Sequence, residues 1–199
     1  MTARYRPRTR DELDPAQRML HDRIVDGPRR AEASVVPITD ADGRLLGPFG
    51  PMTIAPVVGD AVQGVGAALR FASTMDARTK EASILLVAAR RRCVYEWVLH
   101  HDAARAAGVP ADAVALLRAG TVPTGIDAET DAALVVVDRL LAASALADEE
   151  YTSALAALGE VVLAELVWLV GYYSMLALAL AVFDPPLGEG VADPWTGGG

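Results

Sequence analysis

Apolar residues recur with helical spacing along most of the chain, and the strict alternation that is typical of strands is scarce. Alanine and leucine, which favour helices, are frequent in the apolar runs. Most of these runs are also too long for strands or have the wrong period. The pattern therefore predicts an all-α protein.

Proline, glycine and capping residues divide the pattern into separate helices. We expect the first helix to begin at Asp14-Pro15, where a capping residue precedes a proline, and to end at Gly27-Pro28. Residues 28–51 should form a connection with a turn at Asp40 to Gly43. Further helices are predicted at 52–71 with an interruption at Pro56, at 76–91 with Ser73 or Thr74 as the cap, from Cys93 to just before Gly108, at 111–118, at 127–144, and from Asp148 to Phe183.

The stretch from Val161 to Phe183 is apolar except for Glu165 and is long enough to span a bilayer. A central carboxylate and the lack of a flanking basic cluster argue against a transmembrane helix. We interpret the stretch as a helix that is buried on every side, because a helix that is apolar all round can lie inside a soluble assembly. This interpretation predicts contacts between subunits.

Composition limits the class of protein. The chain has 199 residues, of which 52% are hydrophobic and 22% charged, and this balance suits one globular domain. A net charge of −8 repels nucleic acid phosphates. The single cysteine, Cys93, cannot form an intrachain disulfide, and the polar, basic N-terminus does not resemble a signal peptide. We expect a cytoplasmic protein that binds neither nucleic acid nor a membrane.

The candidate chemistry lies around Cys93, Glu96 and His100. At roughly 100° per residue, these positions fall at about 0°, 300° and 340° on a helix, so the three groups share one narrow stripe. The start of a helix and a nearby imidazolium would both favour the thiolate of Cys93, whereas Glu96 would disfavour it. Glu81 can join the group only if its helix packs antiparallel to the next one.

Each of these residues also has an ordinary structural explanation. Cys93 could be a small buried apolar residue, Glu96 a surface ion-pair partner, and Glu81 a first-turn partner of the helix dipole. His100 or His101 could be a hydrogen-bonded helix histidine. One cysteine, separated acids and two adjacent histidines do not give zinc-ligand spacing, and no phosphate-binding loop or serine-nucleophile motif occurs.

The spacing of these residues resembles the carboxymuconolactone decarboxylase and alkylhydroperoxidase D superfamily. Glu81 is followed after eleven residues by Cys93-x-x-Glu96-x-x-x-His100 and then by Ala-x-x-Ala-Gly108. Gly47-Pro48-Phe49 before a helix that ends in Leu69-Arg70, and the segment from Glu165 to Met175, are also similar to longer members. The resemblance implies an oligomeric helical bundle, as trimers or hexamers. Together with the residue pattern, it predicts an N-terminal extension with one helix at 1–45, the family domain at 46–190 and a flexible tail at 191–199.

The resemblance also implies roles for the site residues. In alkylhydroperoxidase D, the equivalent helix carries Cys-x-x-Cys with a proton-relay glutamate and histidine, which correspond here to Glu81 and His100. Glu96 replaces the second cysteine, so no resolving thiol exists within the chain. Carboxymuconolactone decarboxylases lack the dithiol, need no cofactor, and decarboxylate a lactone acid by proton transfers.

Three functions remain open from the sequence. The first is a cofactor-free lyase, decarboxylase or isomerase that acts on a small carboxylated lactone or enolisable acid. In this reading Glu96 and His100 are the acid and base, Glu81 orients the imidazole, and Cys93 lines the pocket. The second is a one-cysteine hydroperoxidase in which peroxide oxidises Cys93 and an external thiol resolves it. The third is a non-catalytic ligand-binding or assembly protein.

Overall fold

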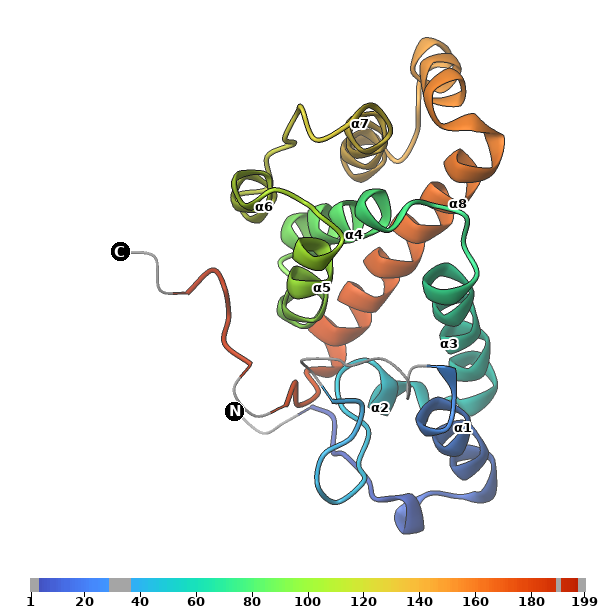
Figure 1. Cartoon of the computed structure of the whole chain (residues 1–199). Helices are drawn as coiled ribbons and strands as arrows, with labels where there is room; N and C mark the ends of the chain where they lie inside the picture. The colour runs from blue at the N-terminus through green and yellow to red at the C-terminus, as the bar shows by residue number, and fades with distance from the viewer. Residues whose placement is uncertain (1–3, 29–36, 189–190, 197–199) are drawn as a thin grey trace. The chain divides into compact units, whose positions relative to one another are not determined.

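The computed structural model describes residues 4–28, 37–188 and 191–196, and all regular elements of these residues are helices (Figure 1). The all-α prediction is confirmed. The oligomeric state remains a prediction. A short 3-10 helix, η1 (Arg10–Glu12), precedes α1 (Pro15–Val25), α2 (Phe49–Met52), α3 (Pro56–Phe71), α4 (Ala77–Arg91), α5 (Val94–Ala106), α6 (Ala111–Arg118), α7 (Ala128–Ala143) and α8 (Asp148–Phe183).

The first helix begins where the sequence predicts. The Asp14 side chain accepts a hydrogen bond from the backbone N–H of Gln17, and Pro15 occupies the first helical position. In the predicted turn, Asp40 Oδ1 accepts the backbone N–H groups of Asp42 and Arg44 at 2.9 Å. Residues 29–36 of the predicted connection lie outside the described residues.

Two predicted details are wrong. Pro56 begins α3 instead of interrupting a longer helix, because its missing N–H and fixed φ are harmless in a first turn but not in a helix interior. The cap of α4 is Asp76, whose carboxylate accepts the backbone N–H of Arg78 at 2.9 Å, and neither Ser73 nor Thr74 takes this role.

The chain forms two compact units, and the first comprises Met1–Ala72 and Leu178–Thr196. Within it, both α1 and α2 pack against α3. Gly59 lies so close to the carbonyl of Met52 that no side chain fits there. The chain beyond α8 is held by the backbone N–H of Gly47, which donates to the carbonyl of Pro186 at 3.1 Å.

Among the described residues, the second unit comprises Ser73–Ala177, and α4 is its central helix. Every residue from Glu81 to Ala89 is buried, and α4 contacts α5, α6 and α7. The hydroxyls of Thr79 and Thr130 lie 3.0 Å apart and join α4 to α7. The limits of the family domain predicted at 46–190, and the flexibility predicted for 191–199, remain predictions.

Helix α8 contains a break and an exposed face. Gly159 has φ 74° and ψ 165°, outside the helical region. By length and composition alone α8 could cross a membrane, and 44% of its most apolar window is buried within the chain. The side chains of Val161, Trp168 and Met175 are exposed. The chain by itself therefore does not bury this helix on every side, and its burial within an assembly of subunits remains a prediction.

The lone charge in the apolar stretch, Glu165, has a structural role. Its carboxylate accepts the backbone N–H of Thr74 at 3.0 Å, the Thr74 hydroxyl at 3.0 Å and the backbone N–H of Met75 at 3.2 Å. It therefore fixes the loop that leads into α4.

We predict that Glu165→Ala lowers the free energy of unfolding by about 1–2 kcal/mol, because hydrogen bonds to a charged group are stronger than neutral ones and two backbone N–H groups lose their partner. Urea unfolding measures this change. Glu160→Ala, on an exposed part of the same helix, is the control and should leave stability within about 0.5 kcal/mol of the unmodified chain. Equal losses in the two variants would contradict this role.

Candidate active site

A tight reversal between α4 and α5 positions the candidate site. Arg92, directly after α4, adopts the left-handed conformation with φ 53° and ψ 38°. The backbone N–H of the next residue, Cys93, donates to the carbonyl of Ala88 at 2.8 Å, which closes the end of α4. Cys93 is then the N-cap of α5. The chain turns back within these two residues, so α5 packs along α4 (Figure 1).

This reversal brings Glu81 of α4 to His100 of α5. His100 Nδ1 lies 2.6 Å from Glu81 Oε2, a short hydrogen bond between two side chains that are 19 positions apart in sequence. The His100 side chain is 1% exposed and that of Glu81 is 11% exposed. A carboxylate at this distance fixes the orientation of the imidazole and favours the tautomer with a proton on Nδ1.

Glu96 lies on the other side of the same ring. Its Oε2 is 3.5 Å from His100 Nε2, one helical turn away on α5. Its second oxygen, Oε1, is buried without a hydrogen-bond partner among the described residues. A buried carboxylate oxygen without a partner costs free energy, so this position is poorly explained by stability alone. The three residues form a carboxylate, imidazole and carboxylate series inside the helical unit.

The environment of Cys93 differs from the sequence expectation. Burial raises the pKa of its thiol to about 12, and the charge of Glu96 adds to the shift. Hydrogen bonds from the backbone N–H groups of Tyr95 and Glu96 favour the thiolate, but they do not offset these two effects. The start of α5 therefore does not produce the lowered thiol pKa that the sequence suggested, because desolvation outweighs the helix end.

Tyr173 of α8 is a neighbour of the site that the sequence analysis did not select. Its ring packs edge-on against the His100 ring, with centroids 5.3 Å apart and an interplanar angle of 88°. Tyr172 packs edge-on against Tyr173 in turn. The sequence signal was two adjacent phenols within an otherwise apolar stretch. His101, by contrast, is exposed and its Nδ1 lies 2.8 Å from Asp102 Oδ1, outside this cluster.

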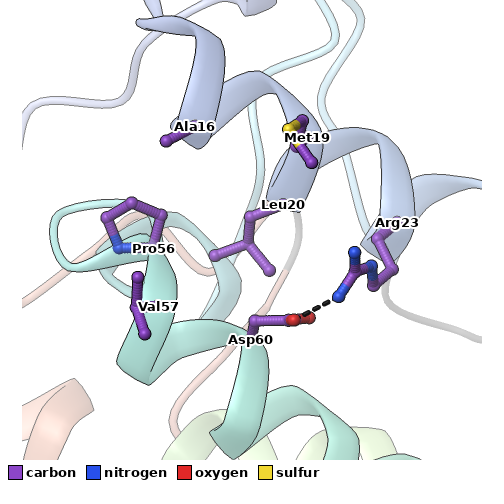
Figure 2. Close-up of a pocket in the computed structure, with 7 residues that line it drawn as sticks. All are labelled: Ala16, Met19, Leu20, Arg23, Pro56, Val57 and Asp60. Atoms are coloured by element: carbon purple, nitrogen blue, oxygen red, sulfur yellow. Dashed lines mark hydrogen bonds and ion pairs between the residues drawn. The ribbon is translucent and has the colours of Figure 1, made fainter.

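In the part of the chain that the structure describes, no group of three His, Cys, Asp or Glu side chains is arranged to hold a metal ion. A hollow between α1 and α3 is lined mainly by apolar side chains, including Leu20 and Val57 (Figure 2). Its two charged lining residues, Arg23 and Asp60, pair with each other, so it presents no group poised for chemistry.

The segment of the chain that holds these site residues matches a known protein family. Residues 56–138 match the sequence model of the Carboxymuconolactone decarboxylase family. The match confirms the predicted resemblance and includes Glu81, Cys93, Glu96 and His100, whereas Tyr173 lies beyond it. No curated protein shows significant similarity to the chain.

We predict that Cys93 reacts very slowly with iodoacetamide below about pH 9, because its thiol stays protonated and buried. Glu96→Gln removes a charge that raises the thiol pKa, so the pH midpoint of alkylation should move to lower pH. Mass spectrometry of the native protein against pH measures both effects. Rapid alkylation of the unmodified protein at pH 7 would contradict this description of the thiol.

The left-handed Arg92 gives a second prediction. A non-glycine residue in this region costs roughly 1 kcal/mol, so Arg92→Gly should raise the free energy of unfolding by about 0.5–1 kcal/mol. Denaturant unfolding measures the change. Arg91→Gly, one residue earlier and still within α4, is the matched control and should be destabilising instead.

Proposed function

We propose that the chain is a cofactor-free enzyme that decarboxylates or isomerises a small carboxylated lactone or related enolisable acid by proton transfer. The observation that carries the proposal is the position of His100 between two carboxylates, with Nδ1 2.6 Å from Glu81 and Nε2 3.5 Å from Glu96. The family of the 56–138 segment supports the same chemistry, because its name describes decarboxylation of a lactone acid.

The geometry suggests a division of roles. Glu81 accepts a hydrogen bond from the Nδ1–H group and holds the ring, so that Nε2 is the nitrogen directed to the reacting proton. Glu96 stands beside Nε2 and can exchange a proton with it after a small movement. Cys93 lines the site as a neutral thiol. Apolar surroundings exclude water, which strengthens the electrostatic effect of each charge on a reacting group.

The proposed decarboxylation balances without a redox partner. The bond between the substrate's carboxylate carbon and its neighbouring carbon breaks, carbon dioxide leaves, and the electron pair enters the conjugated carbonyl system as an enolate. The protonated His100 then delivers a proton to carbon and is reprotonated from water. In an isomerisation, Glu96 and His100 would remove a proton from a carbon next to a carbonyl and return it to another carbon.

The alternative of a one-cysteine hydroperoxidase has weaker support. The nucleophile in that reaction is the thiolate, and burial together with Glu96 raises the pKa of Cys93 to about 12. The residue in the position of a resolving cysteine is Glu96. A dose of hydrogen peroxide followed by mass spectrometry separates the two reactions, because rapid sulfenic acid formation at Cys93 would favour the peroxidase.

We predict that His100→Gln and Glu96→Gln each reduce turnover by roughly 10²- to 10⁴-fold, which is the usual contribution of a positioned general acid or base. Carbon dioxide release from carboxymuconolactone and other lactone acids, and solvent deuterium incorporation by NMR, provide the assays. His101→Gln, adjacent in sequence but exposed, is the matched control and should retain full activity.

His100→Gln also keeps a side-chain donor for Glu81, which limits the loss of stability from an uncompensated buried carboxylate. Circular dichroism should verify that each variant is folded. Full turnover in both folded variants would refute the assigned roles. Absence of any turnover or exchange by the unmodified protein over the panel would instead favour the binding function.

A further inference from the structure

A hollow lies in the surface of the second unit, between α7 and the first part of α8. Its volume is about 460 Å³, within the range that is usual for pockets that hold small organic ligands. We call it the α7–α8 hollow. None of its lining residues belongs to the candidate active site. Its apolar lining residues are Ala132, Val135, Val136, Leu146, Ala154 and Ala157.

The sequence of the two facing helices explains why this space is open. Most of the apolar lining residues are alanine or valine, whose short side chains do not fill the gap between α7 and α8. Val136 and Ala154 are buried, whereas Val135 is exposed to solvent. The hollow therefore leaves apolar surface in contact with water, and covering this surface with an apolar ligand is favourable.

Three of the four polar side chains that line the hollow are engaged in contacts with the chain itself. Arg139 Nε lies 2.6 Å from Glu150 Oε1, which joins α7 to α8. The other oxygen of this carboxylate, Glu150 Oε2, accepts the backbone N–H of Ala147 at 2.8 Å. The Ser153 hydroxyl donates to the backbone carbonyl of Glu149 at 2.8 Å. These contacts hold the rim of the hollow in place.

The fourth polar side chain, Glu149, is available to a ligand. In the described part of the chain, no hydrogen bond or ion pair occupies its carboxylate. An ionised carboxylate only accepts hydrogen bonds, so a ligand that meets it must supply a donor. Since Arg139 and Glu150 balance each other, the lining carries a net charge of about −1, and a positively charged donor gains Coulomb attraction as well.

We propose that the α7–α8 hollow binds a small organic cation in which an apolar chain or ring carries an ammonium group. The apolar part lies against the alanine and valine side chains of the two helices, and the ammonium group donates to the carboxylate of Glu149. Binding is non-covalent and involves no residue of the candidate active site. The proposal therefore stands apart from the proposed proton-transfer chemistry of His100 and Glu96.

A cation suits the hollow better than an apolar anion or a neutral apolar molecule. Arg139 is the one cation among the described lining residues, and an anion would have to displace Glu150 from it. The first turn of α8 carries Asp148, Glu149 and Glu150, and these charges repel an anion. A neutral ligand without a donor would take water from Glu149 and leave this carboxylate without a partner.

Isothermal titration calorimetry of the full chain with three probes of equal chain length tests the ligand class. The probes are octylammonium, 1-octanol and octanoate, which differ in charge. Octylammonium should bind with a dissociation constant of about 0.1–1 mM, as suits so small a ligand, and octanoate about tenfold more weakly. Raising the salt concentration from about 50 to about 500 mM should weaken the binding of octylammonium but not that of 1-octanol, because salt screens the contact with Glu149.

Substitutions in the lining test the place of binding. Glu149→Gln should weaken the binding of octylammonium about three- to fivefold and leave that of 1-octanol unchanged, because an exposed ion pair contributes modestly. Glu160→Gln, an exposed acid of α8 outside the lining, is its control. Ala157→Trp should weaken all three probes at least about tenfold by filling the hollow. Ala156→Trp, at the exposed neighbouring position outside the lining, is its control and should bind normally.

Methyl NMR of the unmodified chain locates the ligand without any substitution. Octylammonium should shift the methyl signals of Val135, Val136 and Ala154, which line the hollow. Shifts confined to methyl groups outside the lining would overturn the proposal. Octanoate binding as tight as that of octylammonium, or no binding of octylammonium up to about 10 mM, would overturn it as well. Circular dichroism should verify that each variant is folded.

Discussion

The site depends on one hydrogen bond inside the helical unit, between His100 Nδ1 and Glu81 Oε2 at 2.6 Å. Two polar side chains on separate helices are buried in an otherwise apolar region, and each provides the other with a partner. Removing one partner of such a pair is expensive, because the remaining group stays buried without compensation. The antiparallel packing of α4 and α5, closed by the reversal at Arg92, is therefore what brings the imidazole and the carboxylates together.

Burial has opposite consequences for the members of this cluster. For the imidazole and the carboxylates it excludes water and brings proton donors and acceptors within a few ångströms of one another. For Cys93 it raises the thiol pKa to about 12, because a thiolate loses its hydration and lies near Glu96. The same surroundings thus disfavour thiolate chemistry at Cys93.

Helix α8 connects the site to the surface. One face carries Tyr173, which contacts His100, and another carries exposed apolar side chains such as Trp168 and Met175. The apolar composition of this helix consequently has two causes. Part of it completes the core around the site, and part is exposed on the surface of the chain. Glu165 is the one charged residue in the apolar stretch from Val161 to Phe183, and its carboxylate binds the loop before α4.

The sequence by itself determined the helical class, because apolar spacing and capping residues act locally. Asp14 with Pro15 marked the start of α1 correctly, and the stripe of Cys93, Glu96 and His100 followed from the helical repeat alone. It also gave the family resemblance, which the match over residues 56–138 confirms. The distance from Glu81 to His100 required tertiary structure, since it depends on how two helices pack. Tertiary structure also decided the state of Cys93 and the place of Tyr173, because desolvation and ring contacts arise from residues distant in sequence.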